Sequence, residues 1–328
     1  AITTFLSPSD GPAAARTPIP RSRRGRPQGG KKGVANTAEV LYHTRIMRAY
    51  IIRTVVCVAA VFSLSLPDAQ AGRIPDFCFV QISDTHINPQ PVGAPDPTRS
   101  DRSVEALEWF SQEASKPQNL QPYNITVGPP AFAINTGDMM EFGAIGKTFA
   151  NFEACFKNLT IPLYLVAGNH DNTWAGVMQI LRDKFGGDHY SFDRYGCHFA
   201  IIDTATPQEP TPTLEQRTLT WLANDLRKVD PQTPVFIFCH HPLSSSEFAK
   251  PYEQLRFFEV IRPYNVVCVV MGHGHSPVYE KWGPIDSVMG GSTFGPNTGY
   301  NMIAVKDDTL YVAYRFRDKP EGYKPLLK

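Results

Sequence analysis

The placement of histidine constrains this chain more than any other feature. Its 328 residues include nine histidines, and six of these fall in five short polar fragments. Each fragment comes just after a run of apolar residues. In chain order they are Asp84-Thr85-His86, Gly137-Asp138, Gly168-Asn169-His170-Asp171, His240-His241-Pro242 and Gly272-His273-Gly274-His275. A random scatter would not give this concentration, so we interpret the rest of the sequence as the scaffold that supports it.

The runs that precede the fragments are short and almost continuously apolar, which is typical of strands buried on both faces. They cover residues 77–82, 131–135, 162–166, 234–238 and 266–271. Segments with helical character separate them, at residues 102–114, 147–159, 177–185, 213–229 and 254–261. This order predicts an α/β fold in which the fragments lie at the carboxyl ends of successive strands, where open sheets place their ligands.

Three further features refine the expected fold. Residues 189–203 have the pattern of a hairpin with Tyr195-Gly196 at its turn. Residues 213–216 match a capping box, in which the side chains of Thr213 and Gln216 would bond to free backbone donors at a helix start. The C-terminal part predicts antiparallel strands at residues 287–289, 300–305 and 310–316.

Two of the fragments place potential metal ligands two residues apart. In an extended segment such side chains point the same way, so Asp84 and His86 are expected to reach one ion. His273 and His275 repeat the spacing, and Gly274 between them is expected to let the backbone pass close to the site.

The other fragments add oxygen donors. The carboxylate of Asp138 can reach two ions with its two oxygens, and Asn169 offers a neutral carbonyl oxygen. Nitrogen and oxygen donors of this kind suit a divalent first-row ion such as Mn, Fe or Zn and do not distinguish among them.

Taken in order, the five fragments resemble the motifs D-x-H, G-D, G-N-H-[DE], H and G-H-x-H of the calcineurin-like metallophosphoesterase superfamily, over residues 77–275. The resemblance implies a four-layer α/β/β/α sandwich, with a site for two divalent metal ions at the C-terminal ends of the strands. Carried over by position, it implies that Asp84, His86 and His275 hold the first ion, that Asn169, His240 and His273 hold the second, and that Asp138 bridges them. His240 is preferred to His241 because the ligand of the family commonly stands two residues before a proline.

Differences from the motifs of two related groups of phosphatases reduce the number of subfamilies that this chain can resemble. Purple acid phosphatases have D-x-G first and a tyrosine three residues after the bridging aspartate, where this chain has His86 and Glu141. Phosphoprotein phosphatases show G-D-x-x-D-R-G, and residues 137–143 lack its arginine. The pattern is most similar to a group that includes bacterial cyclic-nucleotide phosphodiesterases, whose opening resembles residues 81–86.

The resemblance predicts an enzyme that hydrolyses phosphomonoesters or phosphodiesters. Two ions would stabilise the attacking and leaving oxygens, and a metal-bound hydroxide would attack phosphorus. We expect His170 to protonate the leaving alkoxide and Asp171 to orient the His170 ring. Alternatively His170 is structural. For His241 the sequence leaves open whether it supports a ligand or touches phosphate.

Two other functional classes compete with the enzyme. One is a non-catalytic module that keeps the fold and binds partners, and the other is a closed structural metal site. An intact ligand set and a spare histidine favour the enzyme. Its expected partner is a small phosphoester, and a phosphodiester, a nucleotide and a phospholipid headgroup all remain open.

Residues 1–46 differ in composition from the rest. They are rich in proline, glycine and arginine and show no apolar periodicity. The segment is interpreted either as a basic tail that contacts anionic partners or as a disordered or upstream-translated stretch.

Residues 47–71 have the pattern of a secretory signal peptide. Arg48 and Arg53 flank the start of the apolar run 55–62, and Ala69-Gln70-Ala71 supplies a small-residue cleavage site. The run is shorter than the ~20 residues that span a bilayer, which favours a signal peptide over a membrane anchor. Residues 72–328 would then be an exported metallophosphoesterase domain, periplasmic or extracellular, with no membrane span.

The charged residues are unevenly distributed along the chain. Of 32 basic and 31 acidic residues, ten and three precede residue 72, so residues 72–328 carry a net charge near −6. That balance argues against a nucleic-acid-binding surface.

Cys78, Cys239 and Cys268 lie in apolar runs and are expected to be small buried hydrophobes. The sequence leaves open a disulfide between Cys155 and Cys197.

Overall fold

The computed structural model describes residues 73–88, 99–174, 176–205, 213–242, 250–319 and 322–327. All of them belong to the compact unit that spans residues 71–328. The predicted tail at residues 1–46 and the predicted signal peptide at residues 47–71 lie outside the described residues. Among the described residues, no helix combines the length and the apolar content that a membrane crossing requires.

The first of two large sheets has the first predicted strand, β1, near its middle. Strands β1, β4 and β5 run parallel, and β12, β13 and β14 extend the sheet antiparallel in the order β14-β13-β12-β1-β4-β5. Their bounds are β1 Phe77–Ile82, β4 Ala133–Asn135, β5 Leu163–Leu165, β12 Gly299–Lys306, β13 Thr309–Phe316 and β14 Tyr323–Leu327. The predicted strand at residues 77–82 is confirmed.

The second large sheet has the order β10-β11-β9-β8-β7-β6. Strands β7, β8, β9 and β11 are parallel, and the edge strands β6 and β10 are antiparallel to their neighbours. Their bounds are β6 Tyr190–Arg194, β7 Cys197–Ile201, β8 Val235–Phe238, β9 Val266–Met271, β10 Val278–Trp282 and β11 Ile285–Met289. The predicted hairpin is confirmed, since β6 and β7 pair across a turn at Tyr195 and Gly196, both with positive φ.

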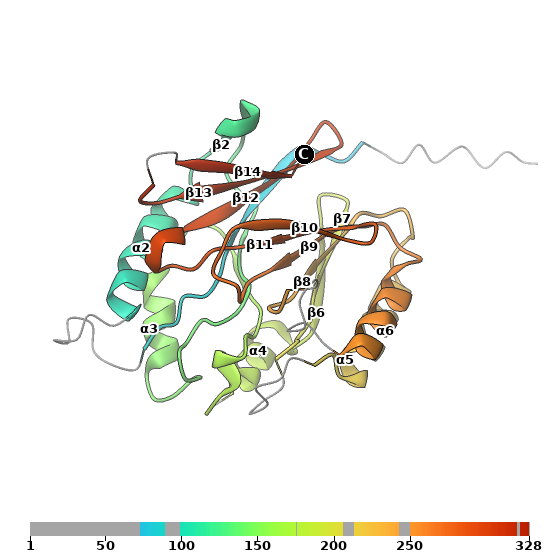
Figure 1. Ribbon diagram of the computed structural model, residues 1–328, viewed down its shortest axis with the longest axis horizontal. Coiled ribbons are helices and arrows are strands. Elements are labelled where there is room, and N and C mark those ends of the chain that lie inside the picture. The colour runs from blue at the N-terminus through green and yellow to red at the C-terminus, as the bar shows by residue number, and fades with distance from the viewer. Residues whose placement is uncertain are drawn as a thin grey trace, which may run out of the picture. The chain divides into compact units, whose positions relative to one another are not determined.

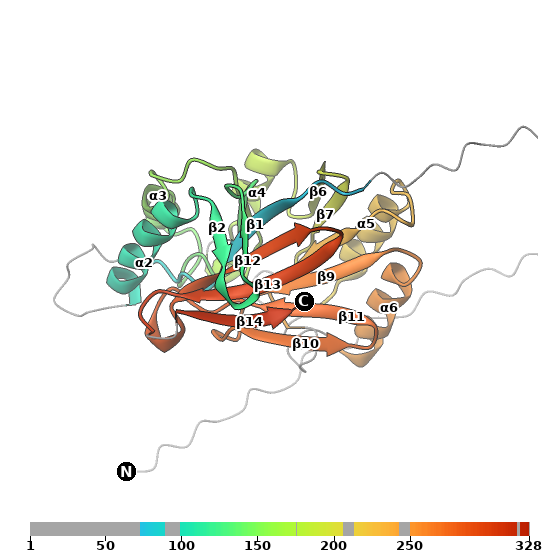
Figure 2. The same ribbon diagram turned by 90° about the horizontal axis from the view of Figure 1, so that it is seen from above.

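Helices cover the outer faces of both sheets, α2 and α3 on one side and α5 and α6 on the other (Figures 1 and 2). Leu107 of α2 and Phe152 of α3 are buried against the first sheet, and Leu222 of α5 and Phe257 of α6 against the second. The helices are α2 Arg99–Glu113, α3 Thr148–Cys155, α4 Met178–Phe185, α5 Gln216–Leu226 and α6 Pro251–Ile261. The smaller elements are β2 Gln118–Leu120, β3 Ile125–Val127, and the 3₁₀ turns η1 Gln121–Tyr123, η2 His170–Asn172 and η3 Gly295–Asn297.

A layer of aromatic side chains fills the space between the two sheets. Phe79 of β1 is fully buried and stacks on Phe132 with 4.8 Å between ring centroids. Its edges meet Phe236 and Phe238 of β8 at 5.4 and 5.8 Å. With helices outside each sheet, these contacts confirm the predicted α/β/β/α order of layers.

The predicted capping box at residues 213–216 is wrong. Helix α5 begins after Glu215, and no side chain bonds to its first backbone amides. The hydroxyl of Thr213 instead donates to a carboxylate oxygen of Glu253 at 3.0 Å, and the other oxygen of that carboxylate accepts from the amide of Lys250. An ionised carboxylate is the stronger acceptor, so the threonine links α5 to the start of α6.

The cysteines in the part of the chain that the structure describes form no disulfides. All five in the described part of the chain are free and buried. Cys155 packs in the core under α3, whereas Cys197 packs between the sheets. Burial raises the pKa of Cys155 to about 11 and that of Cys197 to about 12. Both therefore act as small apolar side chains, and the pairing left open by the sequence is not formed.

The aromatic layer predicts a large stability loss for Phe79→Ala. Removing a fully buried ring that contacts both sheets should lower the free energy of unfolding by about 3–5 kcal/mol. Tyr252→Ala is the matched control, because Tyr252 is 66% exposed on α6. It should change that free energy by about 0.5 kcal/mol or less. Denaturant unfolding of both variants measures the difference, and equal losses would contradict the assignment of Phe79 to the central core.

Candidate metal centre

The five polar fragments meet where the two sheets lie side by side. Asp84 follows β1, Asp138 follows β4 and Asn169 follows β5, all at the carboxyl ends of parallel strands. His240 follows β8, and His273 and His275 follow β9, at the same ends of the second sheet. Ligand atoms from both sheets come within 4.8 Å of one another in several groups of three. Convergence at the strand ends is therefore confirmed.

Three side chains form a first group, which we call the first trio: Asp84, His86 and His275. The Nε2 atom of His275 lies 3.3 Å from the Nε2 of His86 and 3.3 Å from Oδ1 of Asp84. The Nε2 of His86 is 3.9 Å from the same Asp84 oxygen. Two ring nitrogens and a carboxylate oxygen thus face a common point.

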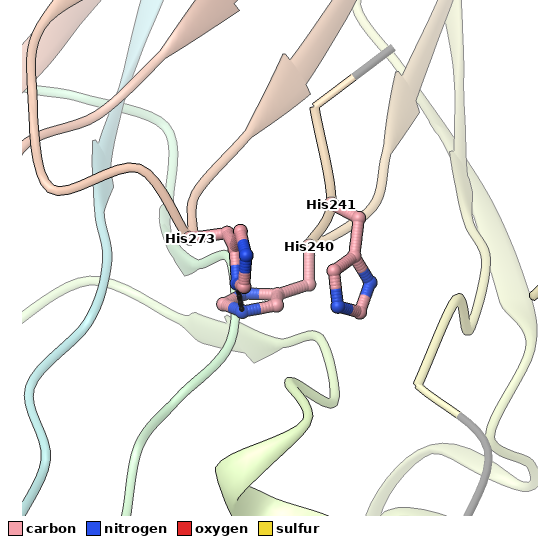
Figure 3. A group of neighbouring side chains, drawn as sticks. All are labelled: His240, His241 and His273. Atoms are coloured by element: carbon pink, nitrogen blue, oxygen red, sulfur yellow. Dashed lines mark hydrogen bonds between the residues drawn. The ribbon is translucent and has the colours of Figure 1, made fainter. Parts of the chain in front are cut away.

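The second trio consists of Asn169, His240 and His273. The Oδ1 atom of Asn169 is 3.1 Å from Nε2 of His240 and 3.2 Å from Nδ1 of His273. The two ring nitrogens are 3.3 Å apart, and a dashed line joins the two rings in Figure 3.

Asp138 lies between the two trios. Its Oδ2 atom is 3.6 Å from Nε2 of His86 and 3.3 Å from Nε2 of His240. Its Oδ1 atom accepts a hydrogen bond of 2.9 Å from the amide of His170. That the Asp138 carboxylate reaches two ions with its two oxygens stays a prediction. One oxygen faces both trios, and the other fixes the backbone of the neighbouring loop.

Two histidines of the trios, His86 and His240, have an oxygen acceptor beside the Nδ1 atom, the ring nitrogen that faces away from the trio. This arrangement suits ligands of a divalent ion. Nδ1 of His240 is 2.8 Å from the carbonyl of Thr136, which can only accept, so Nδ1 carries a proton, and Nε2 presents its lone pair once the second proton leaves the ring. Nδ1 of His86 lies 2.9 Å from Oε2 of Glu141. A carbonyl or carboxylate behind an imidazole is the usual support of a metal-ligating histidine.

The charges of the site favour a cation. Burial alone would lower the pKa of His240, but the carboxylate of Asp138 raises it to about 9. Burial alone would raise the pKa of Asp138, and His240 holds it below its ordinary range. The buried carboxylate is thus stabilised by positive charge beside it, which a divalent ion supplies.

Five of the seven side chains in and between the trios project from left-handed backbone. The φ angles are 54° at Asp84, 44° at His86, 52° at Asp138, 71° at His273 and 53° at His275. The extended conformation expected for the D-x-H and H-x-H pairs is therefore wrong, although the side chains of each pair converge. Such φ values are uncommon for residues with a Cβ and concentrate at functional sites.

Hydrogen bonds between fragments hold this backbone in place. The amide of His273 lies 3.1 and 3.0 Å from the two carboxylate oxygens of Asp84. The amide of Asp84 donates to the carbonyl of Gly137, and the amide of His86 donates to the carbonyl of Asp138. The first and second sheets are thereby tied together at the site itself.

Gly168 and Gly272, and not Gly274, are the glycines at which the backbone of one fragment packs closely against another fragment. A Cβ on Gly274 would meet the flexible end of the Met289 side chain at 2.6 Å. A Cβ on Gly168 would collide with the backbone and carboxylate of Asp138, and one on Gly272 would collide with Ser83. Gly168 and Gly272 allow the fragments to pack, and the prediction for Gly274 is wrong.

His170 and Asp171 do not form the expected pair. The carboxylate of Asp171 is buried and accepts from the amides of Met140 and Gly168, both at 2.9 Å. Nδ1 of His170 is 2.8 Å from the carbonyl of Glu141. Burial, and then the charge of Asp138, raises the pKa of Asp171 to about 7. The predicted orienting role of Asp171 is wrong, because both of its oxygens serve backbone amides, and the Glu141 carbonyl orients His170 instead.

His241 lies beside the second trio (Figure 3), and one of its ring nitrogens is within 4.8 Å of a ring nitrogen of both His240 and His273. Its Nδ1 is 2.9 Å from the hydroxyl of Thr204, and its ring centroid is 4.8 Å from that of His273. Burial holds the pKa of His241 well below its ordinary value, so the ring is neutral. Support of a ligand and contact with phosphate both stay predictions.

The sequence interpretation missed Glu141 as part of the site. Its carboxylate contacts His86, and its backbone carbonyl contacts His170, so one residue touches both a trio member and the predicted acid. The signal was present, because Glu141 stands three residues after Asp138. In the sequence comparison, this position served only to distinguish the chain from purple acid phosphatases, which have a tyrosine there.

Glu141→Gln should weaken metal binding while leaving the fold intact. The amide keeps the shape of the side chain but loses the charge behind His86, and changes of such supporting groups typically cost about 10–100-fold in metal affinity. Competition of a chelating dye for Mn²⁺ measures the affinity. Glu153→Gln, which alters a surface pair with Lys184, is the control. Unchanged affinity in Glu141→Gln would contradict the supporting role.

Comparison with known proteins agrees with this geometry. The sequence profile described as calcineurin-like phosphoesterase matches residues 78–277, more than half of the chain. A cAMP/cGMP dual specificity phosphodiesterase of Mycobacterium tuberculosis is 26% identical over 215 residues, which cover 61% of this chain and 62% of that protein. A probable glycerophosphodiester phosphodiesterase of Arcobacter nitrofigilis is 26% identical over 182 residues, which cover 50% and 56%. The match thus spans less than two thirds of each relative.

A solved structure supports the fold assignment. The dimetal phosphatase from Danio rerio superposes with a TM-score of 0.54 at 14% identity, over 77% of this chain and 99% of that one. Fold, site geometry and profile agree, and the chain belongs to the calcineurin-like phosphoesterase family.

Proposed function

We propose that this protein is a metal-dependent hydrolase of small phosphate monoesters or diesters, and that its centre holds two divalent ions. The observation that carries the proposal is the position of Asp138. One carboxylate oxygen lies 3.6 Å from a nitrogen of the first trio and 3.3 Å from a nitrogen of the second. A single anionic oxygen facing two separate groups of donors is suited to a bridging ligand.

The donor set and the relatives support the same chemistry. The first trio would hold one ion, the second trio the other, and Mn, Fe and Zn all suit these nitrogen and oxygen donors. When bound, two ions stabilise the attacking and leaving oxygens of a displacement and make a bound water more acidic. The relatives named above act, by their names, on cyclic nucleotides and on a glycerophosphodiester.

The chain's own residues supply the proton for the leaving group. The side chain of His170 is 34% exposed, and its ring lies 4.7 Å from that of His86. Because Nδ1 faces the carbonyl of Glu141, the proton on Nδ1 is retained, and the exchangeable proton sits on Nε2. Donation from Nε2 to the leaving alkoxide leaves the neutral tautomer that the Glu141 carbonyl already stabilises.

A non-catalytic module on the same fold is the second candidate. It would keep the layers and lose members of the donor set, since nothing else in the fold needs them. All members of both trios and Asp138 are present here, and His170 lies beside them, within 4.8 Å of ligand atoms of His86 and Asp138. These features favour the enzyme.

His170→Ala should keep its metal and lose activity unevenly. General-acid assistance is worth about 10²–10⁴ in rate and matters most for a poor leaving group. The variant should therefore lose far more kcat on glycerol 2-phosphate, whose leaving group is an alkoxide, than on p-nitrophenyl phosphate.

The measurement is kcat on both esters for wild type and variant, with metal content determined for each and a chelator-treated sample as the blank. Equal losses at full metal occupancy would show that His170 does not donate the leaving-group proton. Activity of the wild type that survives complete metal removal would sink the proposed function as a whole.

A further inference from the structure

A cavity outside the metal centre lies between the edges of the two sheets. Strands β10 and β14 contact each other there, each at the end of its own sheet (Figure 2). The cavity has a volume of about 420 Å³, within the ~300–1,000 Å³ of small-molecule sites. Residues from β10, β13, β14 and the adjoining loops line it, including Ser276, Pro277, Asn297, Phe316, Lys319 and Lys324.

Two lysines give the cavity a positive wall. Nζ of Lys319 donates to Oδ1 of Asn297 at 3.0 Å, and Nζ of Lys324 donates to the carbonyl of Pro277 at 2.6 Å. Among the described residues, the hydrogen-bond acceptors of these two ammonium groups are neutral oxygens. An ammonium carries three donors, so each lysine retains donors for a ligand.

Two aromatic side chains, those of Phe316 and Tyr323, give the cavity an apolar part. Phe316 is buried, and its ring lies 4.1 Å from the ammonium of Lys319. Tyr323 is half-buried at the start of β14 and also lines the cavity. Because the Lys319 ammonium covers a face of Phe316, the ring of Tyr323 is the flat apolar surface that the cavity offers to a ligand.

We propose that this cavity binds a small organic anion, with a phosphate or phosphonate group at Lys319 and Lys324 and a planar apolar part against Tyr323. Charge-assisted bonds from two ammonium groups would fix the anion, and burial of the planar part would add affinity. The two requirements together exclude a purely apolar ligand and a bare inorganic ion as the best occupant.

The cavity adjoins the metal centre without being part of it. Ser276 and Pro277 directly follow His275 of the first trio. Nδ2 of Asn297 donates at 3.0 Å to both the carbonyl of His275 and the hydroxyl of Ser276. An experiment must therefore separate anions held by the lysines from anions held by metal, and the proposal stands whether or not the chain hydrolyses phosphoesters.

Phenylphosphonate is the probe, because its carbon–phosphorus bond resists hydrolysis. Isothermal titration calorimetry of the full chain, with and without chelator, should show saturable binding under both conditions. Lys324→Glu, at an exposed position, should weaken that binding by about tenfold or more, as expected for loss of a charged hydrogen bond. Lys319→Gln should weaken it in the same direction, and benzyl alcohol should bind far more weakly than phenylphosphonate.

Lys228→Gln is the matched control, since Lys228 is exposed just after α5, on the helices of the second sheet, and pairs with Asp225. It should bind phenylphosphonate like the wild type, and thermal unfolding confirms that each variant is folded. Absence of saturable binding to the wild type would overturn the proposal. Equal affinity in the lysine variants, or binding that disappears with chelator alone, would overturn it as well.

Discussion

The position of the Asp138 carboxylate is the constraint on which the rest of the site depends. One of its oxygens faces His86 and His240, which come from different sheets, and the other accepts from the amide of His170. A buried carboxylate in this position is costly unless positive charge lies beside it. The same residue therefore sets the spacing of the two trios and creates the demand for the cations that would occupy them.

The fold meets this constraint by fixing two sets of strand ends against each other. Aromatic rings between the sheets, with Phe79 against Phe236 and Phe238, set the distance between β1 and β8. Interlocking of rings in a close-packed interior leaves little freedom for one sheet to slide over the other. Hydrogen bonds such as that from the amide of His273 to Asp84 then join the two sheets at the site. Bringing the ligands together requires a strained, left-handed backbone at their positions. That backbone persists because the ring packing and the hydrogen bonds hold it in place.

Much of this architecture could be predicted from the sequence because the buried strands are continuous apolar runs that end abruptly in polar fragments. Strands β1 and β9 were expected with the bounds that the structure shows. Strand β10, Val278–Trp282, was missed because its sequence VYEKW, at a sheet edge, is neither continuously apolar nor alternating. The site residues were found through their motifs. Their backbone conformation was not predicted, because the enrichment of Asp and His at positive φ is too weak to locate it at particular residues. The partners of Asp171 were not predicted either, because they are backbone amides, those of Gly168 and Met140, which carry no side-chain signal.

The central claim is that one centre, built around Asp138, holds two ions. Anomalous diffraction from crystals of the full chain soaked in Mn²⁺ tests it most directly. The account predicts two manganese peaks, one among Asp84, His86 and His275 and one among Asn169, His240 and His273, with the Asp138 carboxylate between them. A single peak, or peaks away from these trios, would contradict it.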